Sequence, residues 1–164
     1  MEHNVALISS VISEHHVTRA HVRLAGDTIS DEEAGRLLRE ARNEWIPGRP
    51  EASADRRTRL QQTLRFVADG LNNHFATEEA FLFTLLGELL ARALILDHRR
   101  IIEALDEAHA AAAAMELEQL EREELLTHEL RIQRSIDHIC HLIDDHARRE
   151  DIVLDMMLKA LQDD

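Results

Sequence analysis

The C-terminal half of the chain has no helix-breaking residue: neither Gly nor Pro occurs from Glu88 to Asp164. Because these two residues interrupt helices and mark turns, this half predicts nearly continuous helix. A single helix of that length would extend about 115 Å, which is too long for a compact domain. We therefore predict a hidden turn in the acidic stretch from Glu116 to Glu124, where the apolar stripe fades.

The N-terminal half predicts further helices. Residues 4–25 carry apolar side chains at helical spacing and are followed by Gly26. A longer helical stretch spans residues 54–86 and ends before Gly87. Short connections between long amphipathic helices favour an antiparallel bundle.

A shorter helix is predicted between these two. Ser30 and Glu33 match a capping box, and the helical pattern after them reaches about Trp45. The Pro-Gly-Arg-Pro segment at 47–50 then gives the strongest turn signal in the chain. We predict a single domain over residues 1–164: an all-α, antiparallel four-helix bundle with an additional helical stretch between its first two site-bearing helices.

Composition narrows the classes of partner. The net charge of −13 disfavours nucleic acid and anionic membrane surfaces, which both require clustered Lys and Arg. The single Cys140 has no partner in the chain for a disulfide, and neither a signal peptide nor a membrane span is evident. We expect a cytoplasmic protein that binds neither nucleic acid nor membrane, with a protein partner unknown.

Histidine is the residue type in excess, with 11 copies in 164 residues. Two copies begin the same pattern: His74 precedes Glu78, and His146 precedes Glu150, each by four positions. Residues at i and i+4 lie on one face of a helix, one turn apart. Each pair can therefore point into the centre of the bundle.

The turns place these pairs at one height. In an antiparallel hairpin, residues equidistant from the turn lie side by side. The midpoint between His15 and His74 falls beside the 47–50 turn, and the midpoint between His98 and His146 falls in the acidic stretch. His15 has the more apolar helix face, so we favour it over the neighbouring His16.

Four imidazoles and two carboxylates in one layer indicate metal binding. Buried ionisable groups must be paired or must bind a metal, because an isolated buried charge is very costly. A mixed nitrogen and oxygen donor set suits Fe, Mn or Zn. We predict a two-metal site with these ligands: His15, His74, Glu78, His98, His146 and Glu150.

These motifs, together with the Glu-Glu-x-x-Leu-Phe run after His74, resemble the hemerythrin-like family of cation-binding domains over most of the chain. The resemblance implies two non-haem Fe ions, bridged by carboxylates and by an oxo or hydroxo group. Two features depart from the oxygen-carrying members: Ile102 follows His98 at i+4, and the last motif ends in Glu150. Both match a subgroup similar to di-iron repair proteins of nitrosative stress, although its N-terminal Cys segment is absent.

The motifs lead to four functional hypotheses. The leading hypothesis is a di-iron protein that binds or senses oxygen, nitric oxide or peroxide, or handles iron in a stress response. The alternative is an enzyme that decomposes peroxide or nitric oxide at the same site. A haem bundle would leave Glu78 and Glu150 without a cation, and a metal-free interaction protein would leave the duplicated motif unexplained.

Three further residues lie near the predicted ligands. Gly70 lies one turn before His74 and is either a tolerated interior glycine or a space for a small ligand beside the metal. Asp97 and Glu14 are candidates to orient a ligand imidazole.

Overall fold

The computed structural model describes residues 28–49, 53–114 and 121–162, with the side chains of 81–84 and 161 excepted. These residues form four helices: α2 (Asp31–Glu44), α3 (Ser53–Leu86), α4 (Glu88–Ala113) and α5 (Arg122–Gln162). The prediction of an all-α chain is confirmed for this part. The helix predicted over residues 4–25 lies outside the described residues. The prediction that α2 is an additional helix, beyond the four of the bundle, therefore stays a prediction.

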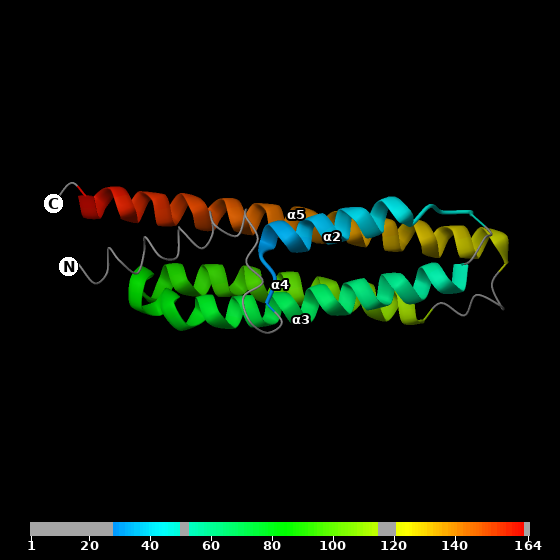
Figure 1. Ribbon diagram of the computed structural model, residues 1–164, viewed down its shortest axis with the longest axis horizontal. Helices are drawn as coiled ribbons and strands as arrows, with labels where there is room; N and C mark the ends of the chain where they lie inside the picture. The colour runs from blue at the N-terminus through cyan, green and yellow to red at the C-terminus, as the bar shows by residue number, and fades with distance from the viewer. Residues whose placement is uncertain (1–27, 50–52, 115–120, 163–164) are drawn as a thin grey trace.

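The helices pack side by side as an antiparallel group (Figure 1). Each contacts the next along the chain, and α5 contacts α2, which closes the ring α2–α3–α4–α5. The short α2 lies beside α5 over one half of the rod, while α3, α4 and α5 continue into the other half (Figure 1).

For the residues that the structure describes, the predicted helix boundaries agree with the observed ones. Gly87 separates α3 from α4 with φ of +73°, a backbone conformation that side-chain-bearing residues rarely adopt. The break predicted in the acidic stretch lies between the end of α4 at Ala113 and the start of α5 at Arg122. At the start of α2, the Oγ of Ser30 accepts a hydrogen bond of 3.1 Å from the backbone N–H of Glu33, as the capping-box pattern predicts.

The apolar core is in two parts. The large cluster fills the half of the rod that α2 covers, and its fully buried members include Leu38, Leu64, Leu71, Leu105, Ile132 and Ile136. A small cluster of Ala91, Leu94 and Ile95 lies earlier along α4. His98 follows the small cluster and precedes Ile101 of the large one, so a polar layer interrupts the core between them.

The loop after α2 is held to α5 by a buried polar cluster. The indole N–H of Trp45 donates to the carbonyl oxygen of Glu129 at 3.0 Å, and the backbone N–H of Gly48 donates to the Glu129 carboxylate at 2.6 Å. The Arg56 guanidinium lies 3.5 Å from that carboxylate and donates to the carbonyl oxygens of Ile46 and Arg49. This cluster connects α2, α3 and α5 at the end of the rod far from His98.

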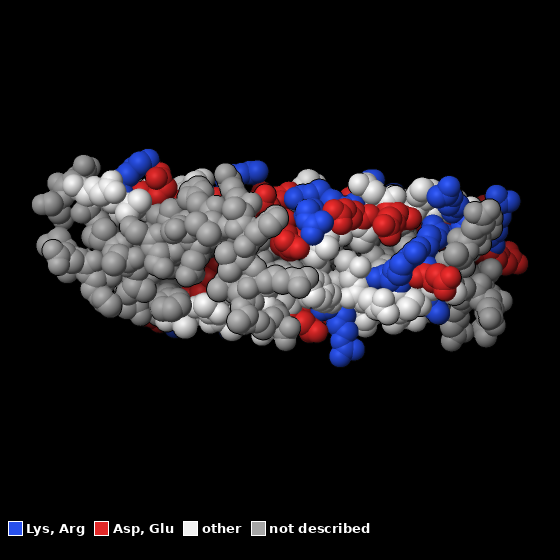
Figure 2. All heavy atoms as spheres, in the orientation of Figure 1, with Lys and Arg blue, Asp and Glu red and all other residues white. Residues whose placement is uncertain are grey.

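Charged side chains of both signs alternate over the part of the surface that α2 and α5 form (Figure 2). Two ion pairs cross between these helices: Arg39 with Asp144 at 3.2 Å and Arg42 with Asp137 at 2.9 Å. Exposed pairs of this kind contribute only about 0–1 kcal/mol each, so burial rather than surface charge holds α2 in place. Among the described helices, none is both long and apolar enough to cross a membrane.

The buried cluster around Glu129 gives the first prediction. Arg56→Met should lower the free energy of unfolding by about 3–5 kcal/mol, because it leaves the buried Glu129 carboxylate without its cation. Urea denaturation measures the change. Arg59→Met on the same helix is the control; it removes an exposed charge and should change stability by no more than about 0.5 kcal/mol. Equal effects of the two substitutions would contradict this role for Arg56.

Candidate metal centre

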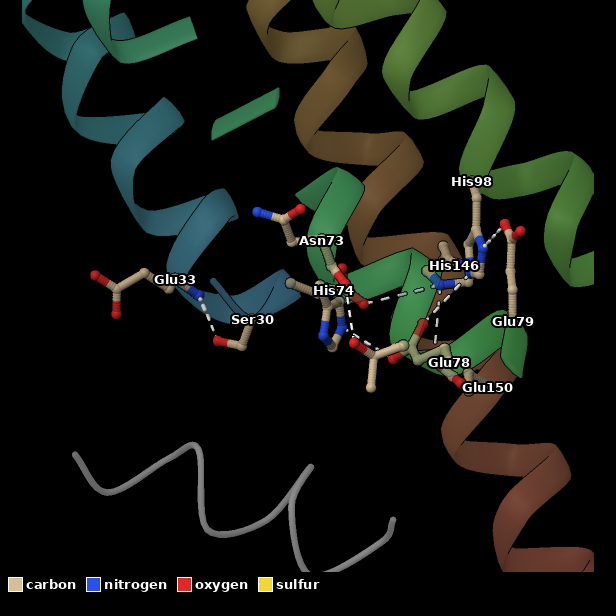
Figure 3. Close-up of polar contacts among 11 residues, drawn as sticks. Ser30, Glu33, Asn73, His74, Glu78, Glu79, His98, His146 and Glu150 are labelled. Atoms are coloured by element: carbon tan, nitrogen blue, oxygen red, sulfur yellow. Dashed lines mark hydrogen bonds and ion pairs between the residues drawn. The ribbon is translucent and has the colours of Figure 1, made fainter. Parts of the chain in front are cut away.

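Three helices contribute side chains to the polar layer (Figure 3). His74 and Glu78 come from α3, His98 comes from α4, and His146 and Glu150 come from α5. Figure 3 shows these five side chains converging between the helices. The structure therefore brings together five of the six residues predicted as metal ligands, and the sixth, His15, lies outside the described residues.

The donor atoms lie close together. Nε2 of His74 is 2.9 Å from one oxygen of Glu78, and Nε2 of His98 is 3.4 Å from the other. Nε2 of His146 is 3.6 Å from Oε2 of Glu150. Both His-x-x-x-Glu pairs thus meet across one turn of helix, as the i, i+4 spacing requires.

Most of these groups are removed from solvent. The exposed fraction is 0% for His146, 1% for Glu150, 2% for His98 and 9% for Glu78. Neither ring nitrogen of His146 has a hydrogen-bond partner within the described part of the chain. A buried polar group without such a partner loses roughly 1–3 kcal/mol of solvation, so this imidazole needs a ligand that compensates for the loss.

The environment keeps His146 neutral. Burial lowers the pKa of His146 to about 3, with a smaller contribution from His98 when that residue is protonated. At neutral pH its nitrogen lone pair is therefore available, which is the state in which histidine binds a metal.

Phe75 packs among the imidazoles and limits their movement. Its ring stacks on His98 with centroids 4.0 Å apart and planes 2° from parallel. It meets His146 edge-on at 5.5 Å, and the two imidazoles meet edge-on at 4.6 Å. A buried aromatic ring so close to the donor nitrogens gives the centre an apolar wall.

Glu79 orients the imidazole of His98. Its Oε1 lies 2.9 Å from Nδ1 of His98, and because a carboxylate accepts, Nδ1 carries the proton and donates it. Nε2 of His98, which faces Glu78, then keeps its lone pair. Asp97, which was considered for this orienting role, instead pairs with Arg149 at 3.2 Å and with Arg100 at 3.7 Å. Glu14, the other candidate, lies outside the described residues.

The donor set fits metal ions. Two groups each place their donor atoms within 4.8 Å of one another: Glu78 with His98 and His146, and Asp31 with His146 and Glu150. Two donors bound to one transition-metal ion at about 2.1 Å lie no more than about 4.2 Å apart. The observed separations of 3.4 to 3.9 Å between imidazole and carboxylate atoms are within that limit. The structure thus contains buried His, Glu and Asp groups that can hold metal ions.

Sequence reasoning did not identify Asp31 or Phe75. Asp31 begins α2, outside both His-x-x-x-Glu motifs, and no periodic pattern connects it with His146. Phe75 directly follows the predicted ligand His74, and this adjacency is the one sequence signal for its place in the centre.

The side chain of Ile29 occupies the space beside Gly70, so the interpretation of that glycine as room for a small ligand was wrong. A Cβ at position 70 would lie 2.7 Å from Cγ1 of Ile29. The backbone N–H of Ile29 also donates to the carbonyl oxygen of Gly70 at 3.4 Å. The missing side chain lets the start of α2 approach α3 closely, one turn before His74.

Comparisons of the chain with protein-family models, with curated proteins and with solved structures found no match.

Glu79 gives a prediction about metal affinity. Glu79→Ala should weaken metal binding about 10- to 100-fold, because His98 loses the acceptor that selects its tautomer and orientation. Competition against a chelator of known affinity measures the effect. Glu103→Ala, which removes an exposed carboxylate from α4, is the control and should leave affinity unchanged. Unchanged affinity in Glu79→Ala would show that the contact with His98 is dispensable.

Gly70 gives a prediction whose sign depends on its neighbour. Gly70→Ala should lower stability by about 1–3 kcal/mol, because the new Cβ overlaps Ile29. In an Ile29→Ala background the same change should raise stability by up to about 1 kcal/mol, since the overlap is gone and alanine favours helix. Urea midpoints of the four proteins in this cycle give the coupling between the two sites. If the effects of Gly70→Ala and Ile29→Ala on stability were additive, the close approach of Ile29 to Gly70 would be contradicted.

Proposed function

We propose that this protein is a non-haem di-iron protein of the hemerythrin-like type, which binds or senses a small molecule such as oxygen, nitric oxide or peroxide, or handles iron in a stress response. The observation that carries the proposal is His146: a fully buried imidazole close to the carboxylates of Glu78 and Glu150, with no hydrogen-bond partner in the described residues. A metal-free core has no use for such a group, because an apolar side chain would pack there at lower cost.

The proposed ligands are those of the two His-x-x-x-Glu motifs together with single histidines. Glu78 lies close to His74, His98 and His146, and His146 lies close to Glu150. His15 would complete the set from the segment 4–25. Two carboxylates with four neutral imidazoles offset only part of the charge of two divalent or trivalent ions, so exchangeable anionic ligands are favoured. Mn and Zn suit the same donors, and the preference for iron comes from the resemblance.

Bound iron would supply exchangeable coordination positions and access to more than one oxidation state. The chain's own residues determine what surrounds those positions. Phe75 excludes water from one side, and Glu79 holds the proton of His98 on Nδ1, away from the centre. Such a fixed environment with an apolar wall favours binding of small ligands over larger ones.

The proposal predicts two irons per chain in aerobically purified protein, with near-ultraviolet absorption from coupled ferric ions. The His146→Ala/Glu150→Ala variant should lose both the iron and the absorption. His141→Ala/Asp145→Ala removes an exposed pair at the same spacing on α5 and should keep both. Elemental analysis and optical spectra on the same samples measure the result. Folded protein that takes up neither Fe, Mn nor Zn on reconstitution would overturn the proposal.

Kinetics separate binding from turnover at the same centre. Rapid spectral changes with oxygen, nitric oxide or peroxide that stop after one equivalent indicate a binding or sensing protein. Sustained consumption of peroxide or nitric oxide, lost in His146→Ala/Glu150→Ala, indicates the enzymatic alternative.

A further inference from the structure

We propose that Asp31 is a further metal ligand, supplied by the first residue of α2 in addition to the two His-x-x-x-Glu motifs. The inference rests on the proposed metal function and adds a third helix-borne carboxylate to the centre. It also gives α2 a role at the site, although α2 carries none of the ligands predicted from sequence.

The position of Asp31 supports this role. Its side chain is only 6% exposed, and its Oδ2 lies 3.9 Å from Nε2 of His146. The same imidazole nitrogen is 3.6 Å from Oε2 of Glu150. Carboxylates from α2 and α5 thus approach one buried imidazole, and the donor atoms of all three residues lie within 4.8 Å.

The needs of the helix do not explain a buried carboxylate at this position. Ser30 already caps α2, since its Oγ accepts the backbone N–H of Glu33 (Figure 3). Acidic residues in a first turn also interact favourably with the helix dipole, but they do so while exposed. Glu32 and Glu33 occupy the same turn and are exposed, whereas Asp31 is buried.

Electrostatics point to a cation between these groups. Two carboxylates a few ångströms apart repel each other strongly when both are buried. The imidazole between them has two ring nitrogens without a hydrogen-bond partner in the described chain. One divalent cation placed among the three would attract both carboxylates and accept the lone pair of His146.

Metal binding by Asp31 would also fasten α2 to the centre. Asp31 is the first residue of that helix, directly after its cap. A metal ion held jointly by α2 and α5 would join the two helices at the polar layer, in addition to their apolar and ionic contacts further along. Binding of the ion and ordering of the start of α2 would then be one coupled equilibrium.

The test compares Asp31→Asn with Glu32→Gln, which removes the neighbouring, exposed carboxylate from the same helical turn. Anaerobic Fe²⁺ titration with a competing chelator gives the affinity of each protein. We expect Asp31→Asn to bind at least one Fe²⁺ about tenfold or more weakly, since loss of a ligand costs no less than loss of a supporting contact. Glu32→Gln should match the unmodified chain.

The other outcomes are distinct. Normal Fe²⁺ binding by Asp31→Asn would overturn the role of Asp31 and leave the proposed function standing. Equal weakening in both variants would indicate an effect of helix-end charge and would also overturn it. No Fe²⁺ binding by the unmodified chain would remove both the inference and the proposed function.

Hydrogen exchange on the unmodified chain decides the question if Asp31→Asn does not fold. Saturating Zn²⁺ should slow amide exchange in α2 (Asp31–Glu44) more than in residues 122–135 of α5, which carry none of the proposed ligands. Equal slowing of the two segments, or none, would overturn the inference.

Discussion

Burial of carboxylates beside neutral imidazoles, in a layer that crosses the bundle, is the constraint on which the rest of this structure depends. Charged groups removed from water must recover their solvation from partners placed with accurate geometry. Three helices therefore have to present His98, His146 and the acidic side chains at one height. The helices can do this because long apolar stripes fix their rotation and because Gly87 sets the register of α4 on α3.

The position of this layer between two apolar clusters follows from the same constraint. The large core on one side contains nine of the ten largest fully buried side chains among the described residues and supplies most of the favourable burial. The small cluster of Ala91, Leu94 and Ile95 closes the other side. Polar groups buried between two apolar clusters lower the stability of the fold unless a ligand binds them. The apolar regions offset that cost.

Much of the fold was predictable from sequence, because its signals are local. The absence of Gly and Pro after Glu88, the cap at Ser30 and the i, i+4 pairs each depend on only a few neighbouring residues, and the structure agrees with them. The contributions of Asp31 and Ile29 were missed because they arise from tertiary contacts between the start of α2 and the longer helices. No periodicity records such contacts.

The carboxylate that orients His98 also comes from a tertiary contact. Asp97 adjoins His98 in sequence, but adjacent residues on a helix point about 100° apart, so its side chain turns toward Arg149. Glu79, on the neighbouring helix, faces the imidazole instead. Sequence proximity made Asp97 a candidate, but the packing of two helices places Glu79 beside the imidazole.

The contact between Ile29 and Gly70 restricts how the chain can vary in length. Ile29 is fixed on α3 by its side chain and by a backbone hydrogen bond, and Asp31 follows only two residues later. An inserted residue between them would lengthen the non-helical link from Ile29 to α2 by up to about 3.5 Å. The contact of Ile29 with Gly70 would then no longer fix the position of Asp31 beside His146, even though every site residue remained. The spacing between Ile29, which packs on Gly70, and Asp31 is therefore as necessary for the geometry of the centre as the ligands themselves.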